Sequence, residues 1–173
     1  MREEKTYEGK MMATGKENEE IILDWLRTKA KDVIDFREVK LVQRLDVDCG
    51  VETIDGEIVL AEIKSDKWIK ENGNLLFEFC RINHYAIDHW FYLGWGWRSP
   101  AQKIIIRNPE TNETFIFVFP ELRKFIGEYI GAVGNKLRIN ITETDKVKTT
   151  FNYLIPFEDI RKSKLAYKKF TVI

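Results

Sequence analysis

The sequence predicts an α/β fold with a mixed central sheet flanked by helices. Segment 57–61, the first part of an expected strand over 57–64, has apolar side chains on both faces, which is typical of a strand at the centre of a sheet that is covered on two sides. Segments with helical periodicity begin the chain and return after Pro120, and strand-like segments lie between and beyond them. A chain of 173 residues without a linker is expected to form a single domain over 1–173.

The first helix is expected to begin at Lys16. Its periodicity places one acid and several apolar residues on a single stripe, namely Glu19, Ile22, Leu23 and Leu26. Glu19 is therefore an acid on the apolar side of the helix. Residues 1–14 are polar and have no pattern, so we expect them to form a flexible arm.

Strands and turns follow the first helix, and glycines and polar runs indicate where they end. In chain order we expect one or two strands over 36–53, a turn at 54–56, the central strand over 57–64, a polar loop over 65–74 and a strand over 74–80. The aromatic segment 84–100 does not indicate a particular structure.

The second half of the chain predicts a hairpin, a helix and late strands. The polar run 108–113 separates two apolar runs, which is typical of a hairpin. A helix over 121–131 follows a proline and ends at glycines. Late strands are expected over 136–142 and 151–156, and a basic helix or tail over 157–170.

Composition limits the class of protein. Lysine plus arginine and aspartate plus glutamate both total 28, so any nucleic-acid binding needs a local basic patch. Cys49 and Cys80 are too few for a disulfide scaffold, and we expect reduced thiols in the core. No apolar run approaches the roughly 20 residues of a membrane span, and the N-terminal residues are charged. We therefore expect a soluble cytoplasmic protein without a signal peptide or a membrane partner.

Glu62 and Lys64 share one face at the end of the central strand, and Ile63 points to the other face. Burying unpaired charge is costly, so these two side chains need partners. Magnesium prefers carboxylate oxygens and keeps several waters, which leaves room for a phosphate and a nucleophilic water. A lysine nearby orients that water or stabilises the developing charge. Asp48 would complete this set, with Asp46 as its rival; a solvated ion pair between Glu62 and Lys64 is the alternative interpretation.

The turn at 54–56 decides whether Asp48 joins Glu62. A two-residue loop at 55–56 would point the Asp48 carboxylate to the wrong face of the sheet. A three-residue loop, with Gly56 in the left-handed conformation, places Asp48 opposite Glu62. The catalytic interpretation therefore predicts the longer loop, or a bulge that has the same effect.

Asp48 and the run Glu62-Ile63-Lys64 resemble the D…(D/E)xK core of the PD-(D/E)xK nuclease superfamily, which includes many restriction endonucleases and Holliday junction resolvases. The resemblance covers about residues 15–107 and extends to Ser65-Asp66, which look similar to those of uncharacterised small phage and bacterial members. Val47 stands where the family often has a proline. The resemblance implies a restriction endonuclease-like mixed sheet flanked by helices, with additional C-terminal strands and helices.

The resemblance also implies roles for individual residues. Asp48 and Glu62 would hold magnesium, or manganese in its place, together with the Ile63 carbonyl. Glu19 would assist, because the run from Gly15 to Glu19 matches the family's Gly-x-x-x-Glu setting on the first helix. Two further catalytic residues would be Lys64, which positions the attacking water, and Gln43, which lies five residues before Asp48, where some members carry a glutamine.

DNA is the expected substrate, and an endonuclease is the expected activity. Candidate nucleic-acid contacts are Lys67, Arg98, Lys162 and Lys164. Short chains of this class often act as dimers, so we expect a possible homodimer through the late strands or the aromatic segment. Two alternatives stay open: a nucleic-acid-binding protein that kept the fold without catalysis, and an interaction subunit in which Glu62 and Lys64 simply pair.

Overall fold

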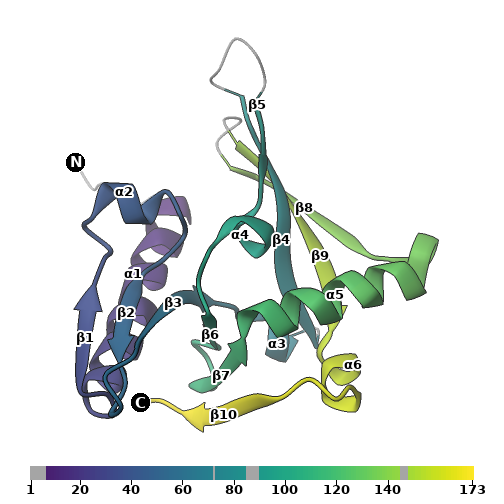
Figure 1. Ribbon diagram of the computed structural model, residues 1–173. Helices are drawn as coiled ribbons and strands as arrows, with labels where there is room; N and C mark the ends of the chain where they lie inside the picture. The colour runs from purple at the N-terminus through teal and green to yellow at the C-terminus, as the bar shows by residue number, and fades with distance from the viewer. Residues whose placement is uncertain (1–6, 72, 85–89, 145–147) are drawn as a thin grey trace.

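Two sheets form the framework of the computed structural model, which describes residues 7–71, 73–84, 90–144 and 148–173 (Figure 1). The first sheet has six strands, in the spatial order β1 (Asp32–Asp35), β2 (Cys49–Glu52), β3 (Ile58–Ser65), β6 (Lys103–Arg107), β7 (Glu113–Val118) and β10 (Tyr167–Thr171). The second has four, in the order β5 (Trp90–Leu93), β4 (Asn74–Asn83), β9 (Lys148–Pro156) and β8 (Ile139–Thr144).

Helices pack around both sheets. They are α1 (Tyr7–Arg27), α2 (Lys40–Gln43), α3 (Trp68–Glu71), α4 (Trp95–Arg98), α5 (Phe119–Val133) and α6 (Phe157–Lys162), with one 3-10 turn at Gly134–Lys136. In the first sheet β3 and β6 run parallel and the other neighbouring strands run antiparallel. The α/β class and the mixed sheet are thus confirmed, whereas the division of the strands between two sheets was not expected.

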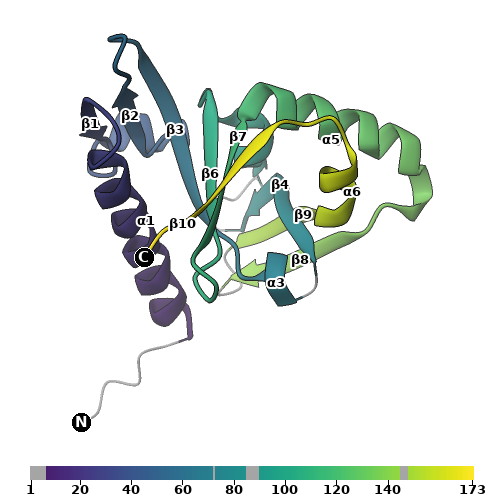
Figure 2. The same ribbon diagram turned by 90° about the horizontal axis from the view of Figure 1, so that it is seen from below.

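The apolar stripe of α1 packs against the first sheet. Ile22 and Leu23 are fully buried there, in a cluster with Ala61 and Ile63 of β3. β10 brings the C-terminal segment back to α1 (Figure 2), where β10 supplies a ring whose centroid lies 5.1 Å from that of Trp25. The central strand β3 is therefore covered on this face, as its apolar pattern predicts.

The first helix begins at Tyr7 and not at Lys16, so residues 7–14 are helical where the sequence indicated an arm. Extending an existing helix is easier than starting one, because each added residue gains a hydrogen bond without a new nucleus. The packed half of α1 supplies that nucleus. Residues 1–6 of the expected arm lie outside the described residues.

The turn between β2 and β3 has the longer form that the catalytic interpretation requires. Gly56 has a φ of 83°, the left-handed conformation that glycine adopts without a steric cost. The Thr53 backbone N–H donates to the Glu57 carbonyl at 2.8 Å, which closes a three-residue loop. Cys49 lies opposite Ala61 in the resulting register. The regular pairing ends at Cys49, and the Asp48 backbone N–H donates to the Ala61 carbonyl at 3.0 Å, so Asp48 lies beside Ala61 where the pairing ends.

A larger core joins the second sheet to the first. It is built from fully buried side chains of β4, β6, β7, β9 and α5, among them Phe77, Ile104, Phe117, Ile155 and Leu122. Packing at this density fixes the relative position of its elements. It therefore holds β4 and β9 beside the end of β3, where a small pocket is lined by residues of all three strands.

Several segments differ from the sequence-based expectation. Within 36–53 only β2 is a strand, and α2 lies before it, because a short apolar run does not distinguish helix from strand by periodicity. The loop over 65–74 contains α3, whose Trp68 N–H is accepted by Asp66 Oδ1 at 2.9 Å. The aromatic segment contributes β5 and α4, with 85–89 outside the described residues.

The C-terminal segment also differs from the expected helix or tail. α6 ends at Lys162, and β10 then pairs antiparallel with β7. The sequence did not indicate this strand because its lysines suggested a solvated basic segment. Lysines are common on edge strands, where they hinder unwanted pairing. The hairpin of β6 and β7, the helix α5 and the late strands β8 and β9 lie where the sequence predicts them.

Candidate active site at the ends of β2 and β3

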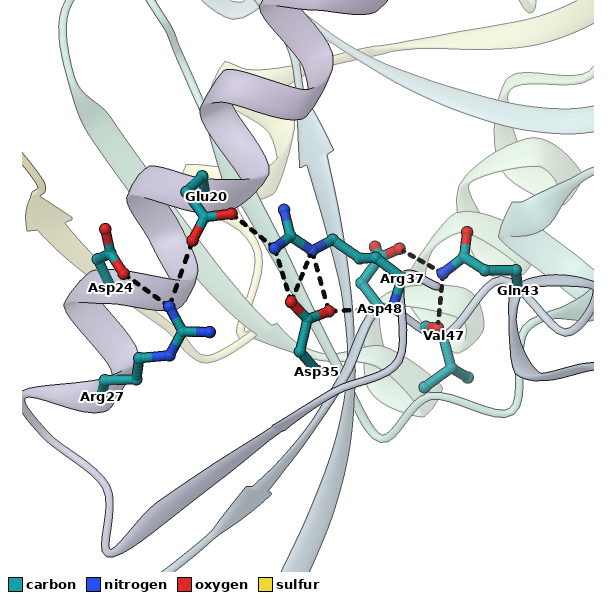
Figure 3. Close-up of polar contacts among 8 residues, drawn as sticks. All are labelled: Glu20, Asp24, Arg27, Asp35, Arg37, Gln43, Val47 and Asp48. Carbon is teal, nitrogen blue, oxygen red and sulfur yellow. Dashed lines mark hydrogen bonds and ion pairs between the residues drawn. The ribbon is translucent and has the colours of Figure 1, made fainter. Parts of the chain in front are cut away.

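The carboxylate of Asp48 is held from two sides just before β2 begins. Its Oδ2 accepts the Ile63 backbone N–H at 2.7 Å, and its Oδ1 accepts the Gln43 side-chain amide at 3.3 Å. The same amide donates to the Val47 carbonyl at 3.2 Å (Figure 3). Asp48 is 7% exposed, so these hydrogen bonds replace most of its hydration. Gln43 therefore acts here from α2 and not from a strand.

Glu62 is buried in the face of β3 that also carries Lys64. It is 1% exposed, and its Oε1 forms an ion pair with the Lys64 ammonium. Its other oxygen, Oε2, is buried without a hydrogen-bond partner. The Lys64 side chain is 31% exposed, and its ammonium lies over the ring of Trp95, 5.5 Å from the ring centroid. The pair is thus half buried and not the solvated surface pair of the alternative interpretation.

Burial and mutual charge determine how these groups titrate. Burial raises the pKa of Glu62 to about 8, with the charge of Asp48 adding to the increase and Lys64 opposing it. Burial opposes the charge of Lys64, but the carboxylates of Glu62 and Asp48 outweigh it and raise the pKa of the ammonium. A buried carboxylate with an unpartnered oxygen and a raised pKa is a group that a cation would stabilise.

Glu19, and not Glu20, is the acid of α1 that faces this site. Burial and the charge of Asp48 raise the pKa of Glu19, whereas Lys64 lowers it. Glu20 instead takes part in a surface network with Arg37 and Arg27 (Figure 3). The choice of Glu19 from the helical stripe therefore agrees with its position.

Glu19 and Gln43 also line one pocket of about 520 Å³, together with Gly15, Lys16, Glu20, Arg37 and Glu38. This pocket lies between α1 and α2. Its lining combines carboxylates with cationic side chains, so it does not present one sign of charge. It gives solvent and solutes access to the side of the site that Glu19 borders.

The Ile63 carbonyl points toward the same edge as its N–H group, because the N–H and C=O of a strand residue lie on one side of the strand. That N–H group is bonded to Asp48. The carbonyl therefore points to the edge of β3 on which Asp48 lies, as the sequence-based ligand set requires.

The donor set fits a hard divalent cation. Magnesium is commonly held by one or two carboxylates plus waters and phosphate oxygens, and not by a full protein cage. Asp48, Glu62 and the Ile63 carbonyl supply such oxygens, and Glu62 Oε2 needs a partner. Within the described residues no group of three or more His, Cys, Asp or Glu side chains is positioned to hold a metal ion. Any cation would thus rely on two carboxylates, the Ile63 carbonyl, waters and a substrate oxygen.

Asp46, the rival ligand to Asp48, is held by a different partner. Its carboxylate accepts the Arg98 Nε–H at 2.8 Å and pairs with a second nitrogen of the same guanidinium. Its backbone has a φ of 53°, and its carbonyl accepts the Ser99 hydroxyl at 2.6 Å. These contacts turn Asp46 toward α4, and they place Arg98, a predicted nucleic-acid contact, at the border of the site.

The other predicted nucleic-acid contacts lie in different places. Lys67 precedes α3, with its ammonium 4.9 Å from the centroid of the Trp68 ring. Lys162 ends α6 and pairs with Glu158 at 3.4 Å, and Lys164 follows shortly after. In both views α6 lies at the opposite end of the molecule from α1 (Figures 1 and 2). The structure therefore does not bring Lys162 and Lys164 to the site.

Some residues around the site were not singled out from the sequence. Asn18, which is 3% exposed, donates to the Ser65 hydroxyl at 3.2 Å and accepts from Arg107, so it ties α1 to the ends of β3 and β6. Its position four residues before Ile22 on the buried stripe is the signal that could have found it. Arg81 and Lys148 come close to each other because β4 pairs with β9 in the second sheet. No local pattern in the sequence indicates this pairing.

Asp66 has a structural role and predicts a pH dependence. Its carboxylate accepts the backbone N–H groups of Trp68 at 2.9 Å and Leu76 at 3.0 Å. Burial nevertheless raises the pKa of Asp66 to about 6, above its ordinary value. A raised pKa means that the folded state holds the proton more tightly, so this group stabilises the fold at low pH and loses that contribution as the pH rises through about 6.

Comparing wild type with Asp66→Asn should isolate this contribution. The stability of wild type relative to the variant is expected to fall by about 2 kcal/mol between pH 4 and pH 7. Urea unfolding at a series of pH values measures the difference. A constant difference across this range would contradict the raised pKa.

Both cysteines are free and buried, as predicted.

Comparisons with protein-family models, with curated proteins and with solved structures found no match to this chain. No helix in the described ranges combines the length and the apolar character that crossing a bilayer requires.

Exposed apolar side chains occur on β5 and β8, including Phe91, Leu93 and Ile141. Self-association through these strands stays a prediction.

Proposed function

We propose that this protein is a magnesium-dependent deoxyribonuclease with a restriction endonuclease-like fold, which hydrolyses phosphodiester bonds in DNA as an endonuclease of the PD-(D/E)xK class. The observation that carries the proposal is the hydrogen bond from the Ile63 backbone N–H to Asp48 Oδ2 at 2.7 Å, which holds the Asp48 carboxylate close enough to Glu62 and Lys64 to influence the pKa of both. Manganese is expected to replace magnesium. Homodimerisation is part of the proposal, because two copies would address both strands.

Each residue has a distinct task in this proposal. Asp48 and Glu62 would hold the cation with the Ile63 carbonyl, and Glu19 would bind one of its waters. When bound, the cation lowers the pKa of a water and stabilises the charge that develops on the phosphate. Gln43 keeps the Asp48 carboxylate oriented through its hydrogen bond to Oδ1.

Lys64 is the catalytic cation. Its ammonium, held beside Glu62, would orient the attacking water and donate a hydrogen bond to the oxygen on which negative charge builds. In the reaction the attacking water gives up one proton to solvent, its oxygen forms the new bond to phosphorus, and one ester bond breaks. The departing ester oxygen takes up a proton from solvent, so that the products are a phosphate monoester and a hydroxyl.

A nucleic-acid-binding protein without catalysis is the second candidate. It is favoured by the ion pair in which Lys64 already occupies one oxygen of Glu62, and by the use of both Asp48 oxygens in hydrogen bonds. Such a protein would bind DNA and leave it intact in every metal.

The test is cleavage by the wild-type protein. Supercoiled plasmid, linear duplex and four-way junction are incubated with magnesium, with manganese and with EDTA. We expect nicked and linear plasmid in both metals and none in EDTA, with the preferred substrate identifying the DNA structure that is recognised. Intact DNA of every kind in both metals, with a folded protein, would overturn the proposed function in favour of the second candidate.

A further inference from the structure

A second pocket lies on the second sheet, away from the pair of carboxylates. Its volume is about 340 Å³, and its lining consists of Arg81, Asn83, Tyr92, Arg98 and Lys148. We call it the second-sheet pocket. It is rich in hydrogen-bond donors, and its size is within the range of pockets that take small ligands.

Strand pairing explains why these side chains meet. In β4 the pocket residues are two positions apart and share a face, and their partners across the sheet are Tyr92 of β5, opposite Arg81, and Lys148 of β9, opposite Asn83. Arg98 joins them from α4. Rigid strands therefore preorganise the pocket, with no loop supplying these residues.

The charges of the pocket do not balance. Arg81 binds Glu78 at 2.8 Å and Arg98 binds Asp46, whereas Lys148 adds a third cation, so two carboxylates face three positive groups. The Nε of Arg81 is buried without a hydrogen-bond partner. Burial lowers the pKa of Lys148, and the charges of Arg81 and Lys64 lower it further, whereas the carboxylates of Glu78 and Asp46 oppose the decrease. A single negative charge placed among these groups would neutralise the excess.

The pocket also communicates with Lys64. The face of β9 that carries Lys148 also carries Asn152, and Asn152 lines the small pocket beside Lys64. Asp46, which pairs with Arg98, contributes to the raised pKa of Lys64. Asn152 and the pair of Asp46 with Arg98 therefore connect the second-sheet pocket with the candidate active site.

We propose that the second-sheet pocket binds one internal phosphodiester group of the DNA strand, next to the group that is cut. A phosphodiester carries one negative charge and offers oxygens that arginine forks and an ammonium recognise well. Such a contact fixes the register of the strand without reading its sequence. The choice of DNA as the ligand rests on the proposed function, and the pocket adds positioning residues that it did not include.

Binding in EDTA tests the pocket separately from catalysis. A fluorescent duplex oligonucleotide is titrated with wild type, Lys148→Gln and Arg81→Gln at several salt concentrations. Loss of one phosphate contact is expected to weaken binding about tenfold at 0.1 M salt and to reduce the salt slope by about 0.9. Lys124→Gln, at an exposed position of α5, is the matched control and should keep the wild-type slope.

A charge-conserving variant separates a phosphate contact from a structural role. Lys148→Arg should retain the wild-type slope, whereas a purely structural role would make it as weak as Lys148→Gln. Duplexes with and without 5′-phosphates should bind equally, because an internal group is recognised. A dependence on the 5′-phosphate, an unchanged slope in both glutamine variants, or no binding by wild type in EDTA would each overturn the proposal.

The outcomes distinguish the two proposals. Wild type that binds with the expected slope but cuts no DNA in magnesium or manganese would refute the proposed function and leave the pocket as a phosphate site. Wild type that cuts DNA, with both glutamine variants binding as tightly as wild type, would refute the pocket and leave the nuclease.

Discussion

Lys64→Met is expected to lower the rate of magnesium-dependent DNA cleavage by about 10²–10³-fold, the cost of losing one preorganised donor at a developing charge. Methionine keeps about the length of the lysine side chain and removes the ammonium, which lies 5.5 Å from the centroid of the Trp95 ring. The buried Glu62 loses its ion-pair partner and takes up a proton instead, so the variant should fold with a lower melting temperature than wild type. The measurement is single-turnover nicking of supercoiled plasmid at saturating protein, which reports the chemical step without product release.

The matched control is Lys103→Ala, at the start of β6, the parallel neighbour of β3. It removes a lysine of the same sheet at a distance from the end of β3, and its cleavage rate should stay within a few-fold of wild type. If Lys64→Met melts at a much lower temperature and cuts at the wild-type rate when folded, then Lys64 is a structural ion-pair partner and not a catalytic cation.

The part of the site geometry that lies close to the turn between β2 and β3 could be predicted from the local sequence. One glycine in the left-handed conformation sets a three-residue loop, and the pairing of β2 with β3 that follows brings Asp48 to β3, where its carboxylate accepts the Ile63 N–H. A prediction of this kind succeeds because the distance from the turn to the site is short and regular. Glu19, the acid on the apolar stripe of α1, could be predicted for the same reason, because helical periodicity is also a short and regular pattern.

The surroundings of the site depend on pairing between distant segments, and here the sequence was insufficient. Arg81 and Lys148 meet only because β4 pairs with β9, and nothing in either segment specifies that partner. Gln43 lies on a helix too short to show a period. The prediction that Lys162 and Lys164 contact DNA was wrong about their position. Their clustering in the sequence suggested a phosphate-binding patch, but α6 lies away from the site.

Glu62→Gln is expected to abolish the stabilisation of the protein by manganese. A ligand that binds only the folded state stabilises it and so raises the melting temperature. At a ligand concentration of one hundred times the dissociation constant, the free energy of unfolding increases by about 2.7 kcal/mol. Glutamine has the shape of Glu62 but lacks its charge. Replacing a residue that only orients a metal ligand typically lowers metal affinity about 10- to 100-fold, so replacing a ligand itself should lower it by at least as much. Glu52→Gln, on β2 at a residue paired with Lys31, should respond to manganese as wild type does.

The pH dependence of this binding distinguishes a ligand from a residue that only shapes the site. Burial raises the pKa of Glu62 to about 8, so below that pH the cation must displace a proton from its carboxyl group. Wild-type affinity is therefore expected to rise by up to about tenfold per pH unit toward pH 8 and to level off above it. Calorimetry in buffers of different ionisation enthalpy would detect the released proton. An affinity that does not change between pH 6 and pH 8, or equal responses of wild type and Glu62→Gln, would mean that the cation binds elsewhere and that the buried Glu62 oxygen has another partner.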